Sequence, residues 1–202
     1  RPALLPPLGQ HIAVARDIAF AFAYPGQLLA WRQAGAELSF FSPLADEAPH
    51  ATADAIFLPG GYPELHAGKL AANTRFQAGL RQAASRQATV YGECGGYMVL
   101  GDALTDSQGQ SHAMLGLLPV ETSFATRKLH LGYRTSRLLA DNPLGRRGTY
   151  LRGHEFHYAT IVSEGDGEAL FIAGDAQGRD LGAYGRRRGT VFGSFLHLID
   201  AA

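Results

Sequence analysis

The chain has little cysteine, no net charge and no long apolar run, and each of these shortages excludes a class of protein. Cys94 is the one cysteine among 202 residues, so no disulfide can form within the chain. This fits a reducing compartment, and we expect a cytoplasmic protein. Lysine plus arginine (18) balance aspartate plus glutamate (18), which argues against electrostatic binding to nucleic acid or to an anionic membrane. No apolar run approaches the ~20 residues of a membrane-spanning helix.

The length suits one α/β domain, or one domain with a modest extension. The chain opens with Arg1 and a proline-rich stretch, Pro2 to Pro7. We interpret residues 1–9 as the remnant of an interdomain linker and residues 10–202 as the domain, so the chain is expected to be part of a longer protein. Three consecutive arginines at 186–188 are flanked by glycines, and we expect a solvated turn there.

The first half alternates between short apolar segments and amphipathic ones, which is typical of a parallel sheet with helices on its faces. We expect strands at 11–15, 37–41, 55–58 and 88–91, and helices at 27–33 and 73–86. Beyond about residue 102, strand-like segments follow one another at 114–122, 129–138, 151–160, 169–173 and 190–194. The prediction is therefore an α/β fold with a mostly parallel sheet flanked by helices, and extra antiparallel strands in the C-terminal half.

The one cysteine follows a predicted strand at a sharp turn. Gly92, Cys94 and Gly96 form a G-x-C-x-G pattern, the thiol counterpart of the strand–turn–helix nucleophile elbow. We expect the following helix to lower the thiol pKa and to supply backbone N–H donors. A buried structural cysteine is the alternative, since free cysteine is among the most buried residue types. The flanking glycines favour a nucleophile.

A thiol nucleophile needs a base and an oxyanion site. His197, after the strand-like segment 190–194, is the most suggestive base, and His154 and His157 are its rivals. On a strand, His154 and His157 face opposite sides, which weakens a two-histidine metal site, and we predict no metal site. Backbone N–H groups near Gly60 or Gly61, after the strand 55–58, could converge with that of Gly95 on an oxyanion. No phosphate-binding fingerprint is present.

Several separated motifs together resemble a known family. They are Leu58-Pro59-Gly60-Gly61-Tyr62-Pro63-Glu64, Gly92-Glu93-Cys94-Gly95-Gly96-Tyr97-Met98, Arg152-Gly153-His154-Glu155-Phe156-His157-Tyr158 and the run from Gly193 to His197. In order and spacing they are similar to the cobyrinic acid branch of class I glutamine amidotransferases, the glutaminase half of a,c-diamide synthases. The resemblance covers about Gln10 to Ile199, and it implies the flavodoxin-like fold of that class.

The resemblance implies a specific chemistry. Cys94 would attack the side-chain amide of L-glutamine and form a γ-glutamyl thioester, with His197 raising its nucleophilicity. Gly61 and Gly95 would form the oxyanion hole, with Gly60, Tyr62, Glu155 and His154 as supporting residues. No cofactor is expected in this chain.

The remaining expectations concern the rest of the polypeptide. ATP and Mg²⁺ would act in an N-terminal synthetase domain, absent here, that amidates the a and c carboxylates of a corrinoid acid in cobalamin biosynthesis. The segment 127–134 favours the hydrogenobyrinic variant of the family. Apart from that there is no basis for choosing among corrinoids. Separated from that domain, the chain is expected to turn glutamine over weakly or not at all.

One departure concerns the third catalytic residue. Many class I glutaminases carry a glutamate two residues after the histidine, where this chain has Ile199. The cobyrinic branch is similar in lacking it, so a Cys–His dyad is expected, with Glu155 as a hypothetical substitute carboxylate. Two alternative functions stay open: a non-catalytic or regulatory domain of the same fold, and another kind of cysteine hydrolase, such as a peptidase. Intact Cys94 and His197 disfavour the first.

Overall fold

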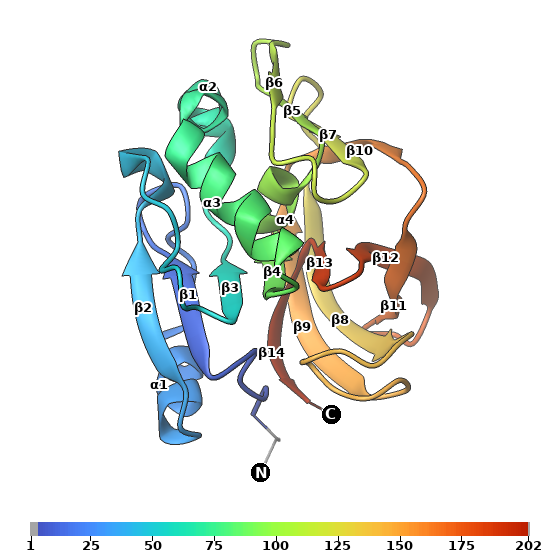
Figure 1. Ribbon diagram of the computed structural model, residues 1–202. Coiled ribbons are helices and arrows are strands. Elements are labelled where there is room, and N and C mark those ends of the chain that lie inside the picture. Colours follow the sequence, from blue (N-terminus) through green and yellow to red (C-terminus); the bar gives the residue numbers. More distant parts are fainter. Residues whose placement is uncertain (1–3, 202) are drawn as a thin grey trace.

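The computed structural model describes residues 4–201, and a ten-stranded mixed sheet forms its centre (Figure 1). In spatial order the strands are β14 (Leu196–Ala201), β9 (Tyr150–His157), β8 (His130–Leu138), β11 (Glu168–Asp175), β12 (Asp180–Arg188), β13 (Val191–Ser194), β4 (Thr89–Glu93), β3 (Ala55–Leu58), β1 (His11–Ala15) and β2 (Glu37–Phe41). Strands β13, β4, β3, β1 and β2 pair in parallel, and the remaining pairs are antiparallel.

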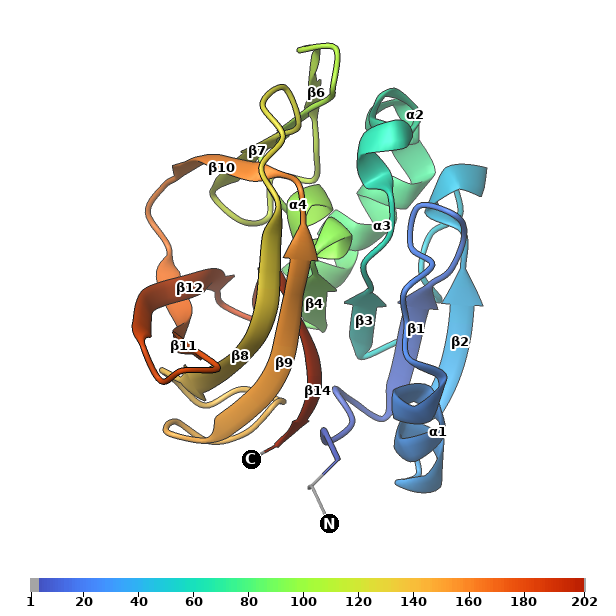
Figure 2. The ribbon, with the colours of Figure 1, turned by 180° about the vertical axis from the view of Figure 1, so that it is seen from behind.

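Four helices cover the two faces of the parallel part. They are α1 (Pro25–Gln33), α2 (Ala67–Ala72), α3 (Thr74–Ser85) and α4 (Gly95–Leu100), with short 3₁₀ turns η1 (Pro43–Ala45) and η2 (Pro63–Leu65). Figure 2 shows α1 in front of β1 and β2, with α3 and α4 on the far side. A small second sheet, in the order β10 (Thr160–Glu164), β7 (Val120–Ser123), β5 (Ala103–Thr105) and β6 (Ser111–Ala113), extends from the α4 side.

The apolar strands are buried on both faces, because their side chains alternate between two hydrophobic clusters. On one face, Ile56 and Leu58 of β3 pack with α3, through Phe76 and Leu80. On the other face, Phe57 packs edge-on against Trp31 of α1, at 5.5 Å between ring centroids. Such two-sided burial is why β3 is a continuous apolar run.

The antiparallel half curves round, so that the C-terminal strand β14 lies beside β4 in both views (Figures 1 and 2). A hydrogen bond marks the meeting point: the Leu198 N–H donates to Oε1 of Glu93 over 3.1 Å. This closure brings the residues that follow β13 and begin β14 to the carboxyl ends of β3 and β4. Ligands bind at that edge in parallel α/β sheets.

The predicted parallel strands and both predicted helices are confirmed, with no end more than two residues from the prediction. The predicted strand 114–122 is wrong over most of its length, because Gly116 adopts a positive φ of 65° and strand pairing begins at Val120. The predicted antiparallel strands of the C-terminal half are present, and most of them continue the central sheet.

The expected turn at 186–188 is also wrong. Arg186–Arg188 end β12, where Arg186 pairs with Glu164 and Arg187 with Glu168 of β11. The turn comes one residue later, at Gly189, whose φ is +59°. The three arginines are therefore held by strand pairing and by carboxylates.

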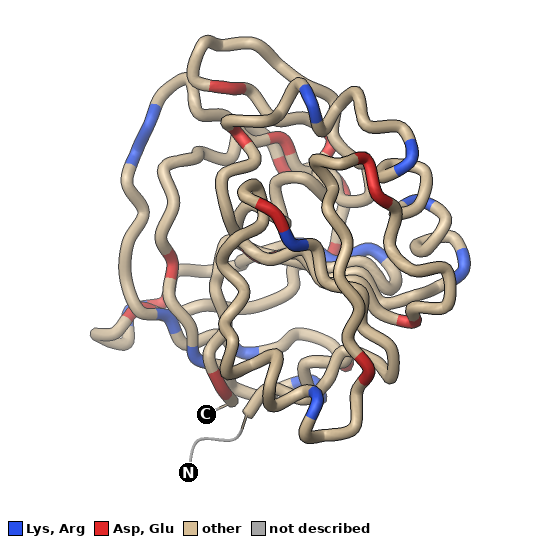
Figure 3. The backbone as a smooth tube through the Cα atoms, turned by 90° about the vertical axis from the view of Figure 1, so that its left-hand side faces the viewer, with Lys and Arg blue, Asp and Glu red and all other residues tan. Residues whose placement is uncertain are grey.

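Of the predicted linker remnant 1–9, residues 1–3 lie outside the described residues. Leu5 and Leu8 are buried in the core, and the Trp31 indole donates to the Leu5 carbonyl. The domain boundaries stay a prediction. No helix within residues 4–201 combines the length and the hydropathy needed to cross a membrane. Figure 3 shows acidic and basic residues interspersed along the chain, in keeping with the formal net charge of zero.

Candidate active site

Cys94 stands at a strained turn between β4 and α4. Its φ of 48° and ψ of −106° are backbone angles that a residue with a side chain rarely adopts, and such strain is concentrated at functional sites. The turn also requires the glycine at 96, since a Cβ there would lie 1.9 Å from the Leu58 carbonyl oxygen. The elbow predicted from the glycine spacing is therefore present, and it holds the thiol at the carboxyl end of β4.

The thiol is buried and un-ionised at rest. Burial is the largest cause that raises the pKa of Cys94 to about 12; the nearby Gly95 N–H lowers it, and the carboxylates of Glu64, Glu93 and Glu155 raise it. The helix lowers the thiol pKa through the Gly95 N–H, as expected, but burial of the sulfur outweighs this effect and the net pKa is raised. To act as a nucleophile, the sulfur would need a neighbouring base to take its proton.

His197 lies on the other side of Gly60 from Cys94. A Cβ built on Gly60 would lie 2.6 Å from Cε1 of His197 and 3.4 Å from Cβ of Cys94, so only a glycine fits between them. The thiol itself donates to the Phe156 carbonyl, with sulfur and oxygen 3.8 Å apart. The imidazole is 4% exposed. Burial, followed by the charges of His154 and His157, lowers the pKa of His197 to about 4. At neutral pH the ring is therefore uncharged and able to accept a proton.

His154 is the nearest neighbour of that base. The two residues are opposite one another on β14 and β9, and their rings stack with centroids 4.8 Å apart and planes 10° from parallel. Nε2 of His154 forms a short hydrogen bond with the Tyr24 hydroxyl. His157 faces the other side of β9, as the strand alternation predicts. The structure thus brings His154, and not His157, against His197.

The two predicted oxyanion donors lie side by side. A Cβ on Gly95 would be 3.2 Å from the Gly61 nitrogen, and one on Gly61 would be 2.1 Å from the Ala19 carbonyl oxygen. Within residues 4–201, the Gly61 N–H donates to no protein acceptor. Gly61 is partly exposed at the rim of the site, so this N–H is available to bind a developing oxyanion.

A narrow pocket of about 60 Å³ opens beside the sulfur. Its lining comes from several separate segments: Phe22, Gly61, Tyr62, Glu64, Cys94, Met98, Phe124, Phe156, His157 and Tyr158. Tyr62, expected as a supporting residue, lies at its rim, 47% exposed and edge-on to Phe22. The pocket is mostly aromatic, with a single acidic group, and its size suits a slender side chain.

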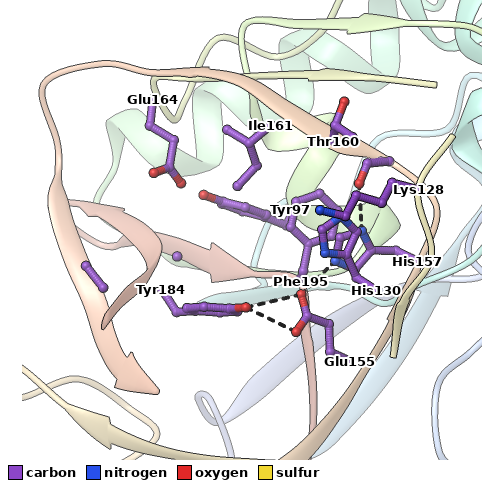
Figure 4. A pocket seen from close by; sticks show the side chains of 13 residues that line it. Tyr97, Lys128, His130, Glu155, His157, Thr160, Ile161, Glu164, Tyr184 and Phe195 are labelled. Carbon is purple, nitrogen blue, oxygen red and sulfur yellow. Dashed lines mark hydrogen bonds and ion pairs between the residues drawn. The ribbon is translucent and has the colours of Figure 1, made fainter. Parts of the chain in front are cut away.

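Glu155 is not brought to His197. Its carboxylate accepts a hydrogen bond from Arg134 Nε at 2.9 Å. It also accepts from His157 Nε2 at 2.8 Å and from the Tyr184 hydroxyl at 3.2 Å (Figure 4). Burial raises its pKa, but the hydrogen bonds and charges of His157 and Arg134 outweigh that effect and hold the pKa below its usual value. The geometry therefore gives no support to the hypothesis that Glu155 orients the imidazole of His197. It is an anchor in the wall of an adjoining cavity of about 300 Å³.

That wall contains a cluster with the composition of a metal site, His130, Glu155 and His157, whose ligand atoms lie within 4.8 Å of one another. Its geometry does not favour a metal. The two imidazoles are stacked 7° from parallel, so their lone pairs do not converge on one point. Both ring nitrogens of His157 already form hydrogen bonds with protein oxygens, Ala159 O and Glu155 Oε1. The absence of a metal site stays a prediction.

Glu93 is a site residue that sequence reasoning did not identify. Its side chain is 1% exposed, and its Oε1 accepts from the Tyr91 hydroxyl at 2.8 Å and from the Leu198 N–H. Burial raises its pKa to about 7, against the lowering effect of those two donors. Because Leu198 follows His197, this carboxyl ties the base-bearing strand to the nucleophile-bearing strand. The signal available in the sequence was an acidic residue between an apolar strand and the cysteine.

Comparison with known proteins decides the family. The protein-family model of the CobB/CobQ-like glutamine amidotransferase domain matches residues 11–202 of the sequence. The chain belongs to this family. It is therefore a glutamine amidotransferase domain of an enzyme, and the resemblance seen in its motifs is confirmed.

Relatives and solved structures agree. The chain is 62% identical over 196 residues to a hydrogenobyrinate a,c-diamide synthase of Brucella anthropi, covering 97% of this chain and 44% of the relative. It is 59% identical to the enzyme of that name from Sinorhizobium sp., covering 98% and 45%. The chain thus spans less than half the length of these relatives. PurLQS from Thermotoga maritima shares its fold, with a TM-score of 0.66 at 19% identity over 93% of this chain and 86% of that one.

Proposed function

We propose that this chain hydrolyses L-glutamine through a thioester on Cys94 and passes the ammonia to a synthetase that is part of the same polypeptide. The observation that carries the proposal is the placement of Cys94 and His197 on either side of Gly60, beside the Gly61 N–H that has no protein acceptor within residues 4–201. A non-catalytic domain has no use for a strained elbow with a buried base against it. The family match disfavours another cysteine hydrolase.

The proposed reaction starts from an un-ionised thiol and a neutral imidazole. Neutral His197 takes the thiol proton as Sγ of Cys94 attacks the amide carbon, because the resting thiol does not ionise unaided. The N–H groups of Gly61 and Gly95 bind the oxyanion. The imidazolium then gives its proton to the departing nitrogen. Ammonia leaves, and the γ-glutamyl thioester remains on Cys94. Water, deprotonated by His197, hydrolyses the thioester to glutamate through a second oxyanion.

The acceptor is inferred from the relatives' names. We assign to the longer protein the amidation of the a and c carboxylates of hydrogenobyrinic acid or a close corrinoid, a step of cobalamin biosynthesis in the cytoplasm. ATP and Mg²⁺ would act in the remainder of the polypeptide, which accounts for over half of each relative, and no cofactor is needed by the chemistry of this chain. Alone, the chain is expected to turn glutamine over slowly or not at all.

The test separates the two half-reactions. The chain, joined to the remaining part of a relative, is supplied with hydrogenobyrinic acid, ATP, Mg²⁺ and either glutamine or an ammonium salt. We expect Cys94→Ser to abolish diamide formation from glutamine and to leave formation from ammonium intact. Loss of both, or of neither, would contradict the proposed role of Cys94 in this chain.

A further inference from the structure

Glu64 is the one acidic residue that lines the Cys94 pocket. It lies in η2, directly after the segment that carries the Gly61 N–H, and it is partly buried. Its Oε2 is shielded from solvent and has no hydrogen-bond partner within the described residues. An unpaired carboxylate oxygen away from water is costly, so a donor from outside the protein is the natural partner for it.

Arg127 does not provide the missing hydrogen-bond donor to Glu64. Arg127 acts on Glu64 through its charge, but they form no ion pair, and Arg127 takes part in none within residues 4–201. The guanidinium lies over the Tyr158 ring, 4.7 Å from its centroid, and Tyr158 lines the same pocket as Glu64. An unpaired carboxylate oxygen therefore lies in the Cys94 pocket, and an exposed guanidinium without an ion-pair partner within residues 4–201 lies over one of the aromatic rings that line it.

We propose that Glu64 and Arg127 are the specificity residues for the α-amino acid group of the substrate, Glu64 binding the ammonium and Arg127 the carboxylate. This inference rests on the proposed glutaminase function and deepens it. A free amino acid carries both charges on one carbon, whereas a peptide-linked glutamine lacks at least one of them. Arginine is suited to a carboxylate by its planar fork of donors, and a carboxylate such as Glu64 to an ammonium. The pair thus selects free glutamine.

Occupancy of Glu64 also changes the thiol. Among the charges that raise the pKa of Cys94, that of Glu64 comes first, ahead of Glu93 and Glu155. An ammonium bound to Glu64 offsets this charge and makes the thiol easier to deprotonate. The other titratable groups around the sulfur are His197, His154, His157, Glu93 and Glu155. The site is therefore at its most reactive when an amino acid is seated in it.

Two electrophiles test the proposal on the same thiol. Iodoacetamide is an amide without an α-amino acid group, and it alkylates sulfur with loss of iodide; diazo-oxo-norleucine carries the full α-amino acid group. Glu64→Gln is expected to slow labelling by diazo-oxo-norleucine about tenfold to hundredfold, the size of a lost charge-assisted hydrogen bond. The same variant is expected to speed alkylation by iodoacetamide about threefold, because the thiol pKa falls.

Arg127→Gln is expected to slow the labelling of Cys94 by diazo-oxo-norleucine. Its rate of alkylation by iodoacetamide should stay within about twofold of the wild-type rate. The matched control is Glu121→Gln, the same change at an exposed glutamate of β7, expected to alter both rates by less than about twofold. Equal slowing of both reagents in Glu64→Gln, or no change in either, would overturn the inference. A wild-type chain whose Cys94 reacts with iodoacetamide but neither with diazo-oxo-norleucine nor competitively with glutamine would instead contradict the proposed function.

Discussion

The imidazole of His154 lies parallel to that of His197, 4.8 Å away between ring centroids, on the neighbouring antiparallel strand. Within residues 4–201 no carboxylate accepts a hydrogen bond from His197, so this stack is its main lateral support. His154 is itself held by the Tyr24 hydroxyl. A ring therefore occupies the supporting role that a carboxylate has in a catalytic triad.

Removing that support should slow the thiol chemistry. His154→Ala is expected to lower the rate of Cys94 labelling by diazo-oxo-norleucine about tenfold, because the base loses its packing surface. His154→Phe keeps a stacked ring but removes a neighbouring charge that lowers the pKa of His197 below its usual value. Its labelling rate should stay within about threefold at neutral pH. The acid limb of its pH profile, near pH 4 in the wild type, should move upward.

The control for these variants is His50→Ala, an exposed histidine before β3, at the opposite end of the strands from Cys94. Labelling rates measured from pH 4 to pH 9 separate the effect of the lost packing surface in His154→Ala from that of the lost charge in His154→Phe. An unchanged acid limb in His154→Phe would show that His154 does not act on the charge of His197.

Glu93 should make stability depend on pH in a definite direction. Its pKa is raised from 4.5 to about 7 by burial, so its contribution to stability is fully present below pH 4.5 and is lost as pH rises through about 7. Glu93→Gln keeps an acceptor for Tyr91 and Leu198 and cannot ionise. The difference in the free energy of unfolding, variant minus wild type, should therefore increase by about 3 kcal/mol between pH 4.5 and pH 8.

Urea denaturation of both proteins at each pH measures that difference, and the other titrating groups cancel in the comparison. His197, whose pKa is lowered, has the opposite effect in both proteins: its neutral form is favoured, and stability falls as pH drops from 6.5 to about 4. A constant difference across this range would mean that Glu93 is not a buried acid.

Gly60 should be required for chemistry more than for folding. In Gly60→Ala the new Cβ would lie 2.6 Å from Cε1 of His197, so the imidazole must shift away from the thiol. We expect labelling of Cys94 to fall more than about tenfold, with loss of a correctly placed base. Gly26→Ala, where a Cβ meets nothing within 4 Å, is the matched control and should label at the wild-type rate. A Gly60→Ala variant that labels normally would show that His197 is not the base.

Glu155 should matter for stability and little for catalysis. Glu155→Gln leaves Arg134 and His157 with an uncharged partner inside the protein, and we expect a loss of about 3 kcal/mol in the free energy of unfolding. In the folded variant, Cys94 labelling should stay within about threefold of the wild type. A large loss of labelling with unchanged stability would return Glu155 to the catalytic site.

The catalytic groups were predictable from the sequence because their constraints are local. Gly92 and Gly96 flank Cys94 within one turn. At Gly60 and Gly61, after β3, a Cβ would clash with neighbouring atoms, so glycine is needed at both positions. The parallel strands were predictable for a similar reason, since two-sided burial gives uninterrupted apolar runs.

The environment of these groups was not predictable, because it depends on how distant strands meet. The stack of His154 on His197 and the bond from Leu198 to Glu93 arise from the curvature of the antiparallel half. The raised thiol pKa has the same origin: burial by other segments outweighs the local helix. The sequence of a strand with several charged residues, such as Arg186–Arg188, resembles that of a solvated turn. Only the structure shows that Arg186 and Arg187 form ion pairs with carboxylates on neighbouring strands.

The most direct test of the account is the intact mass of the chain after incubation with diazo-oxo-norleucine, with Cys94→Ser and His197→Ala in parallel. We predict one adduct on wild-type chain, none on Cys94→Ser, a slowed reaction in His197→Ala, and protection by excess glutamine. An adduct formed equally fast by His197→Ala, or one that glutamine does not prevent, would contradict the assignment of this site as a glutaminase dyad.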